Sequence, residues 1–449
     1  MNYLLRTKRA VAFVTLLMSG VVQLNAQTIN TGAGKINTVT SAVPFLRIIP
    51  DARAGGMGDV GIATPCYGND SYLSPDINGL YTNPAKVAFI DKDFGVAVTF
   101  SPWLKALVND IYLANIAGYY KIKKMQTVAL SVRYFSLGNI TFTDFNGQET
   151  GQFRPNEFAI DGHYARRLGK YFSIAASLRF TYSNLAGGQS VDGNLVKPGM
   201  AGSADISWYF RKKFNENANH KMEHELSVGM NISNIGSKIS YTSSVVKDYI
   251  PTNLGIGIGY TLDIDKHNSV GVYADVNKLM VPTPDTLDKN NNKIYDFREK
   301  SSVSGMFTSF GDAPGGAKEE FNEVTWGVGA EYLYNKQFGV RFGYFYEHPL
   351  KGNRQFLTAG LTVKYSVVGL NFSYLIPTTI QRNPLDNTLR FTLLFDFTKG
   401  GKKAAGSTGV SLVPDEPKKK ERKVKEDEPT KEPIEMKPIE KKFEPVEPK

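Results

Sequence analysis

The sequence predicts an all-β fold, a 14-stranded antiparallel transmembrane β-barrel with an N-terminal hatch or plug segment. Three observations lead to this prediction. The chain of 449 residues begins with an export signal, it then alternates between apolar and polar residues with a period of two, and its connections separate into short and long ones. A chain of this length is sufficient for one large barrel.

Residues 1–26 have the pattern of a secretory signal peptide. Basic residues at Arg6, Lys8 and Arg9 precede a short apolar stretch over 10–22, and Ala26 provides a small residue before the predicted cleavage point. The apolar stretch is too short to be a comfortable membrane anchor, and no later window approaches eighteen apolar residues. We therefore expect export and a location in the outer membrane.

The barrel is predicted over 93–398 because strand-like segments recur there. Within 171–183, for example, Ile174, Leu178 and Phe180 share one parity, while Ser177 and Arg179 share the other, so one face is apolar and the opposite face is polar. Most segments have the length of a tilted bilayer span. The fourteen segments are 93–100, 110–120, 126–136, 156–166, 171–183, 199–210, 224–234, 253–263, 267–277, 323–334, 337–347, 355–365, 367–376 and 388–398.

The connections between these segments provide an independent indication of the same architecture. Those after even-numbered segments are mostly short, with 211–223 as the exception, and those after odd-numbered segments are mostly long. The short ones are 121–125, 167–170, 264–266, 335–336 and Ser366, and the long ones are 137–155, 184–198, 235–252 and 278–322. Short periplasmic turns opposite long outer loops are typical of outer-membrane barrels. An even strand number also predicts that both termini are periplasmic.

Aromatic residues near segment ends suggest the girdles that form at membrane interfaces, although ordinary cross-strand packing would explain any one of them. They are Tyr119, Tyr120, Trp208, Tyr209, Phe210, Phe395 and Phe397. The formal net charge of +10 is compatible with simple solubility or with attraction to anionic lipid or lipopolysaccharide.

Two regions fall outside the predicted barrel. Residues 27–92, rich in Gly, Pro, Asn and Asp, are expected to fold into the lumen as a hatch or plug, and the alternative is a loose periplasmic arm. Residues 399–449 are expected to be a disordered periplasmic tail rich in Lys, Glu and Pro, because they contain only isolated apolar residues. The tail is either a solvated spacer or a contact for a periplasmic partner.

No arrangement of residues predicts an enzyme or a nucleic-acid partner. The five histidines are scattered, Cys66 has no identifiable histidine partner, and the glycine run 255–259 is not followed by the helix that a phosphate-binding loop requires. A weak calcium candidate follows EF-hand spacing at Asp288, Asn290, Asn292, Asp296 and Glu299, with the carbonyl of Ile294 between them. Lys293 occupies the position where that loop needs glycine, so a polar surface loop and no cofactor are favoured.

Residues 50–59 read Pro-Asp-Ala-Arg-Ala-Gly-Gly-Met-Gly-Asp and form the most distinctive motif of the chain. Further distinctive stretches are 81–89, 275–279, 310–316, 343–348, 374–377 and 387–392. Together these motifs closely resemble the PorV (LptO) family. The resemblance implies a barrel like those of FadL-type fatty-acid transporters, with an N-terminal hatch, acting in the outer membrane as a component of the type IX secretion system of Bacteroidota.

The resemblance also implies partners. It suggests docking on the translocon barrel SprA (Sov), binding of cargo through its C-terminal secretion domain, and transfer of that cargo to the attachment complex that contains the sortase PorU. The family signature comprises Pro50, Asp51, Ala52, Arg53, Gly55, Gly56, Met57, Gly58 and Asp59. We expect its main role to be packing of the hatch.

Partner contacts are expected on the long outer loops, because loops on a rigid scaffold commonly carry binding. The candidates are Phe310, Asp312, Pro314, Gly315, Gly316, His348 and Arg354, with Phe321 and Phe356 as further aromatic anchors. The competing hypothesis is a FadL-like transporter of hydrophobic small molecules. A transporter needs an apolar pocket and a continuous path, whereas a docking protein needs exposed loop surface.

Overall fold

The computed structural model describes residues 36–66, 75–103, 110–143, 146–188, 190–191, 194–215, 222–242, 247–285, 287–289, 291, 294–379 and 388–397. The chain divides into two units, 1–399 and 400–449, and every described residue belongs to the first. The predicted signal peptide over 1–26 and the predicted tail over 399–449 lie outside the described residues.

Fourteen strands form a closed barrel in which each strand is antiparallel to its neighbours, and β1 pairs with β18 to complete the ring. The strands are β1 (Phe94–Pro102), β2 (Ile111–Lys123), β3 (Gln126–Leu137), β6 (Asn156–Arg167), β7 (Phe172–Asn184), β10 (Gly199–Phe214), β11 (Glu223–Gly236), β12 (Asn253–Asp263), β13 (Asn268–Leu279), β14 (Val324–Tyr334), β15 (Phe338–Tyr346), β16 (Gln355–Tyr365), β17 (Val368–Pro377) and β18 (Leu389–Phe397). This confirms the predicted fold class. Each predicted segment corresponds to one of these strands.

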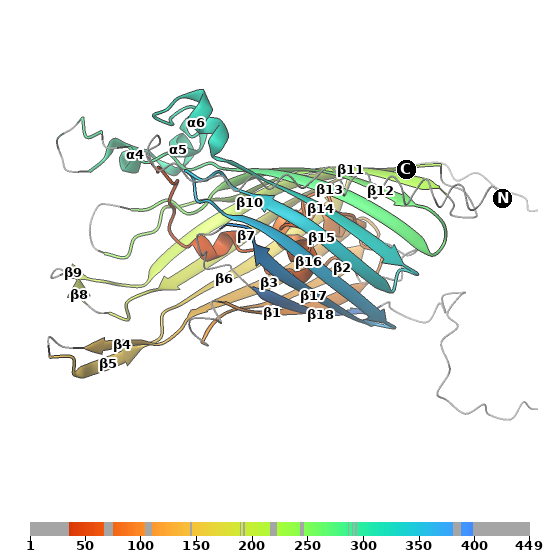
Figure 1. Cartoon of the computed structure of the whole chain (residues 1–449), viewed down its shortest axis with the longest axis horizontal. Coiled ribbons are helices and arrows are strands. Elements are labelled where there is room, and N and C mark those ends of the chain that lie inside the picture. Colours follow the sequence, from red (N-terminus) through yellow and green to blue (C-terminus); the bar gives the residue numbers. More distant parts are fainter. Residues whose placement is uncertain are drawn as a thin grey trace, which may run out of the picture. The chain divides into compact units, whose positions relative to one another are not determined.

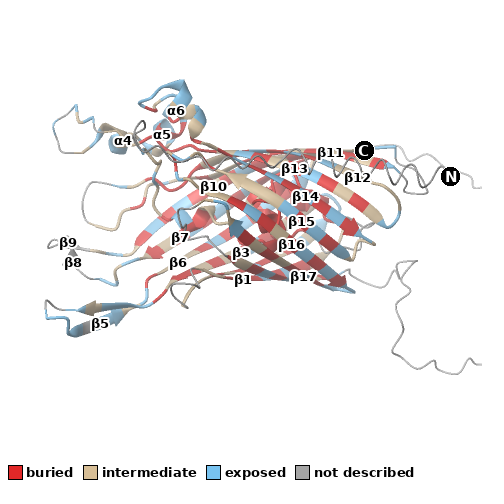
Figure 2. Cartoon of the chain, viewed as in Figure 1, coloured by how far each residue is buried: buried red, intermediate tan, exposed pale blue. Residues whose placement is uncertain are grey.

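The alternation of the sequence becomes the two faces of the barrel wall. In β7, Leu178 is 74% exposed on the outer face, while Ser177 and Arg179 are buried on the inner face. The same banding of buried and exposed residues runs along the other strands (Figure 2). An apolar outer face and a polar inner face are required when lipid surrounds the barrel.

The aromatic residues near strand ends divide between these faces, because successive side chains of a strand point in opposite directions. Tyr120 is exposed on the outer face. Tyr119 and Tyr209 are buried, and the Tyr209 ring lies 5.7 Å from that of Phe89 inside the barrel. The expectation that Tyr119 and Tyr209 belong to an interfacial girdle is therefore wrong, and both residues pack against the contents of the lumen.

The barrel has two different ends (Figure 1), which we call the turn end and the loop end. The turn end carries the short connections, such as that between β14 and β15, and also the start of β1 and the end of β18. The loop end carries the long connections, which contain secondary structure that the alternation did not predict. These elements are the hairpins β4 (Ile140–Thr143) with β5 (Glu149–Phe153) and β8 (Ser190–Val191) with β9 (Asn194–Leu195), and the helices α4 (Asp296–Glu299), α5 (Ser302–Thr308) and α6 (Ala317–Asn322).

Residues 43–66 and 75–90, which we call the luminal segment, lie inside the barrel (Figure 1). Their short helices are η1 (Pro44–Arg47), α2 (Ala52–Gly55), α3 (Gly79–Thr82) and η2 (Pro84–Phe89). Helices this short bury their polar backbone groups against the wall, so the wall must provide hydrogen-bond partners. None of the helices among the described residues has the length and apolar character needed to cross a membrane.

Candidate functional site

The signature motif forms a tight turn around α2 at the centre of the luminal segment. Asp51 caps the helix, because its side chain accepts a hydrogen bond from the Ala54 amide at 3.0 Å. The Ala52 amide donates to Thr392 Oγ1 of β18 at 3.1 Å. The residues that begin the helix are therefore held both by their own cap and by the barrel wall.

The glycines of the motif allow the backbone to approach the wall closely. A Cβ atom at Gly56 would lie 2.9 Å from the Cα of Gly360 in β16. Gly58 has a φ of +71°, its amide donates to Thr358 Oγ1 at 2.8 Å, and a Cβ there would lie within 2.8 Å of the Tyr344 backbone. Both positions exclude larger side chains, and Gly58 also requires a left-handed backbone.

Arg53 anchors the motif to the wall at β14. Its guanidinium donates to both carboxylate oxygens of Glu331 in β14, at 3.2 and 3.0 Å, and forms an ion pair with Asp76 at 3.2 Å. Asp76 also accepts from Lys86 Nζ at 2.9 Å, and Arg341 Nε donates to Glu331 at 2.6 Å. All five side chains are buried, so each charge depends on this network for compensation.

Two further contacts fix the end of the motif. Asp59 accepts from Arg390 Nη1 of β18 at 2.8 Å. Asp275 of β13 accepts from the amides of Gly61 and Ile62, at 2.7 and 2.9 Å. These bonds direct the luminal segment across the barrel from β18 to β13.

The partners of the signature were not identified from the sequence. Glu331, Arg341 and Arg390 belong to the wall. Asp76 and Lys86 belong to the luminal segment itself, and Lys86 lies in a matching family stretch but received no role. The available signal was the parity of the strands. Glu331 and Arg341 occur on the polar parity of otherwise uncharged stretches, and a charge facing inward in a filled barrel needs a partner.

Electrostatics inside the lumen favour retained charge at this network and a neutral thiol nearby. Burial raises the pKa of Asp76, but Lys86 and Arg53 outweigh it and lower that pKa below its ordinary value. Burial raises the pKa of the Cys66 thiol to about 12. A thiol with so high a pKa carries almost no thiolate near neutral pH, so this cysteine lacks the property that a nucleophile needs.

Charged side chains line two cavities beside the luminal segment. The larger, toward the loop end, has a volume of about 110 Å³, and Arg47, Arg133, Arg354, Asp59 and Asp275 contribute to its lining. The smaller, of about 10 Å³, has room for about one water molecule and is lined in part by Arg53, Asp76 and Arg341. Charged linings of this kind differ from the largely apolar walls of sites for hydrophobic ligands.

The predicted loop residues occupy different environments. Phe310 and the turn Pro314–Gly315–Gly316 are exposed at the start of α6, and Gly316 has a φ of +71°. Asp312 accepts from the Thr283 amide at 3.2 Å and lies 3.7 Å from Lys300. Asp312 therefore holds the loop together, whereas Phe310 and the turn are exposed to solvent.

His348 and Arg354 belong to the connection between β15 and β16. His348 Nδ1 accepts from the Leu350 amide at 3.2 Å, and burial, with Lys351 and Lys318, lowers the pKa of His348. Arg354 donates to Glu347 through Nε and Nη2, at 2.7 and 2.8 Å. His348 shapes the loop, and Arg354 contributes to the lining of the larger cavity.

The expectation for Phe356 as an exposed anchor is wrong. Its ring is buried and stacks on that of Phe345 with the centroids 4.8 Å apart. The exposed aromatic residues of the described part of the β13–β14 connection are Tyr295, Phe307, Phe310 and Phe321, and Phe307 and Phe321 are 71% and 78% exposed. Phe307 was not singled out from the sequence, because nothing in the alternation predicted the helix α5 that presents it.

The calcium prediction stays a prediction. Asn290 and Asn292 lie outside the described residues, as does Lys293. Asp296 begins α4 and accepts from the Lys289 amide at 3.1 Å. Among the residues that the structure describes, no group of three or more His, Cys, Asp or Glu side chains is placed to hold a metal ion.

An apolar outer face, a charged lumen filled by its own N-terminal segment, and helical loops at one end define an outer-membrane β-barrel protein. A family model described as "Type IX secretion system protein PorV" matches residues 31–286. The chain therefore belongs to the PorV family, and its location is the outer membrane.

No curated protein matches the sequence. Some solved structures are similar to the chain at low identity. The Pseudomonas putida toluene transporter TodX is 10% identical with a TM-score of 0.44, covering 77% of this chain and 98% of that chain. A Pseudomonas aeruginosa FadL homologue is 10% identical with a TM-score of 0.39, covering 80% of this chain and all of that chain.

Proposed function

We propose that this protein docks on the translocon of the type IX secretion system, binds the C-terminal secretion domain of cargo and passes that cargo to the attachment complex. The translocon partner is the SprA (Sov) barrel, and the recipient is the PorU-type sortase complex. The observation that carries the proposal is the combination of membership in the PorV family with a lumen in which the signature is bonded to the wall.

Binding is assigned to the loop end. The loop end offers exposed aromatic side chains outside the lipid, on α5 and α6, and aromatic anchors commonly provide most of the energy at protein interfaces. The loop end faces the cell exterior in this proposal, following the separation of short and long connections.

The lining of the lumen supports docking over transport of hydrophobic molecules. A path for an apolar ligand would have to pass Arg53, Asp76 and Glu331, which are paired and buried. Moving an apolar molecule there would separate charges in a low-dielectric interior, which costs several kcal/mol by the usual order of magnitude.

The test uses exposed residues so that the barrel stays folded. Phe307→Ser with Phe321→Ser should lose most of the translocon barrel and cargo that co-purify with the wild type from detergent-solubilised outer membranes. Ile140→Ser, an exposed apolar residue on the β4–β5 hairpin, is the matched control and should retain both partners. Full retention by the double variant would reject the assignment of binding to α5 and α6. Loss of fatty-acid uptake with intact partner binding would favour the transporter hypothesis.

A further inference from the structure

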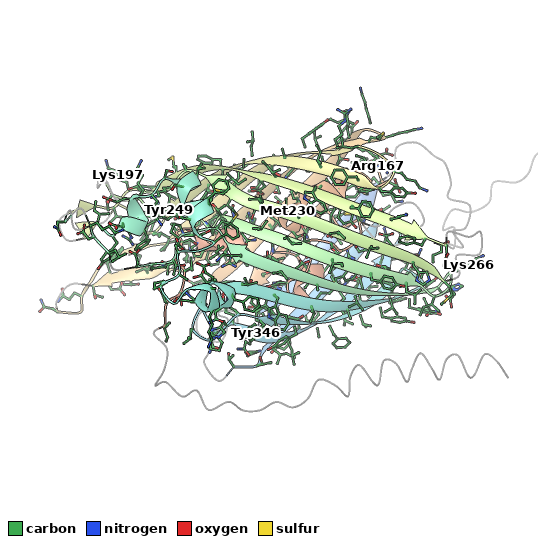
Figure 3. All side chains as sticks on the ribbon, turned by 90° about the horizontal axis from the view of Figure 1, so that it is seen from above. Arg167, Lys197, Met230, Tyr249, Lys266 and Tyr346 are labelled. Carbon is green, nitrogen blue, oxygen red and sulfur yellow. The ribbon has the colours of Figure 1, made fainter. Side chains whose placement is uncertain are left out.

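The first described residues lie at the loop end of the barrel. The Asn37 amide donates to the Leu350 carbonyl at 3.2 Å, and the Ala42 amide donates to the Tyr249 carbonyl at 2.8 Å. Tyr249 lies at the end of the barrel opposite to Lys266, which belongs to a short turn (Figure 3). Ile36 is 73% exposed, so the chain reaches solvent there.

The last described residue lies at the other end. Phe397 of β18 pairs with Phe94, the first residue of β1, and their rings stack with centroids 4.8 Å apart. The Asp93 amide donates to the Phe397 carbonyl at 3.1 Å. The described residues therefore lead through the lumen, from Ile36 at the loop end to Asp93 at the turn end, and the strands of the wall follow.

The luminal segment fills the space through which the polypeptide would have to cross the lumen a second time. It forms hydrogen bonds with at least ten strands around the wall, namely β1, β2, β3, β7, β10, β11, β13, β14, β16 and β18. A passage outside the wall is excluded by lipid, because an irregular backbone in the hydrocarbon would leave its polar groups unsatisfied.

We infer that the chain enters this barrel from one face of the outer membrane and leaves it on the other. The entry point at Ile36 shares the face of the long loops, and the exit at Phe397 shares the face of the short turns. The expectation that both termini are periplasmic stays a prediction, because the termini lie outside the described residues. In the orientation of the proposed function, on which this step rests, the described residues from Ile36 to Ala42 belong to the surface that meets the translocon and cargo.

Residues 36–42, which we call the N-terminal strap, also join the loops into one surface. Asn37 Nδ2 donates to the Pro284 carbonyl at 3.3 Å and to Glu319 Oε1 at 3.2 Å. Glu319 also accepts from Lys351 at 2.5 Å. The strap thus connects the loop before α4, the helix α6 and the β15–β16 connection.

An ion-pair cluster under the strap holds the same elements. Lys351 pairs with Glu323 at 3.0 Å, and Lys278 pairs with Glu323 and Glu320, at 2.7 and 3.0 Å. Burial raises the pKa of Glu319, but Lys351 and the Gly315 amide outweigh it and lower that pKa. The exposed aromatic residues of α5 and α6 are therefore presented by a connected loop surface of which the strap is a part.

The test is cysteine labelling with a membrane-impermeant maleimide, in the full chain with Cys66→Ser. The variants are Ile36→Cys at the entry point, Lys318→Cys on α6 and Lys266→Cys on a short turn, all at exposed positions. Each is labelled on intact cells and again after the outer membrane is permeabilised. We expect Ile36→Cys and Lys318→Cys to label on intact cells, and Lys266→Cys to label only after permeabilisation.

The outcomes test two claims separately: that the chain enters and leaves the barrel on opposite faces, and that the loop end faces the cell exterior. The inference is overturned if Ile36→Cys labels under the same condition as Lys266→Cys and not under that of Lys318→Cys. It is also overturned if Ile36→Cys labels under neither condition. If Ile36→Cys and Lys318→Cys both require permeabilisation while Lys266→Cys does not, the proposed orientation fails but entry and exit on opposite faces stands. Heat-modifiable migration on gels confirms that each variant is folded.

Discussion

Arg53 donates two hydrogen bonds to Glu331, 278 residues later in the chain, through Nε at 3.2 Å and Nη2 at 3.0 Å. One residue belongs to the signature turn inside the lumen, and the other faces inward from β14. Both are almost completely buried. This pair joins the luminal segment to the wall and explains why the signature contains an arginine at this position.

Arg53→Ala should strongly destabilise the folded barrel. It leaves Glu331 and Asp76 buried without one of their cations, and breaking a buried ion pair costs about 3–5 kcal/mol. Thermal unfolding in detergent, followed by the heat-modifiable band on gels, measures the change. Lys266→Ala, on an exposed turn, should leave the transition unchanged. Equal transitions for the two variants would show that the Arg53 network contributes little.

Gly58→Ala should also destabilise the protein. The left-handed backbone alone costs a residue with a Cβ about 1–2 kcal/mol, and the Cβ would meet the Tyr344 backbone at 2.6 Å. Gly311→Ala is the control, because nothing lies within 4 Å of a Cβ at that position. The denaturant concentration at the midpoint of unfolding should fall for Gly58→Ala and stay unchanged for Gly311→Ala. An unchanged midpoint for Gly58→Ala would contradict the close approach between Gly58 and the Tyr344 backbone.

Cys66 should resist maleimide in the folded protein. Its side chain is buried and its thiol pKa is raised to about 12, so both access and thiolate are lacking up to pH 9. Labelling should appear on denaturation. Phe321→Cys in a Cys66→Ser background should label without denaturation. Rapid labelling of native Cys66 would mean that the luminal segment opens.

Acid should weaken the Asp76 contacts. Lys86 and Arg53 hold the pKa of Asp76 below its unfolded value, so its stabilisation is complete above the unfolded pKa and is lost as pH falls through the folded one. Asp76→Asn should therefore be less stable than the wild type at pH 7, and the difference should shrink as pH falls below about 4. A difference that does not vary with pH would contradict the charged state of Asp76.

The strands were predictable because lipid imposes a strict rule on the outer face. In β7 the residues of one parity must be apolar, and in β12 the Ile256 and Ile258 side chains alternate with glycines in the same way. Connection length then separated the loop end from the turn end. Such local patterns survive in sequence because each strand needs its own lipid-facing side chains.

The interior of the barrel was less predictable, because its contacts join distant residues. The sequence alone does not indicate that Arg390 reaches Asp59 or that Tyr209 turns inward to meet Phe89. The helices α5 and α6 lack the period that marked the strands, so Phe307 was missed and Phe356 was misassigned. The even or odd position of a residue along a strand correctly predicted whether its side chain points inward or outward. Which residues pair across the lumen was evident only from the three-dimensional structure.

The central claim is that the luminal segment stays bonded to the wall while the protein works at its loops. The Ala52 amide donates to Thr392 Oγ1 at 3.1 Å, so a cysteine crosslink between these two positions would hold the segment against the wall. In a Cys66→Ala background, Ala52→Cys with Thr392→Cys should lock the segment when oxidised, and each single cysteine is the control. The measurement is delivery of cargo with a C-terminal secretion domain to the cell surface, before and after reduction. We predict equal delivery by the locked and reduced forms. Delivery that stops on oxidation and returns on reduction would contradict the claim, because the segment would then have to move.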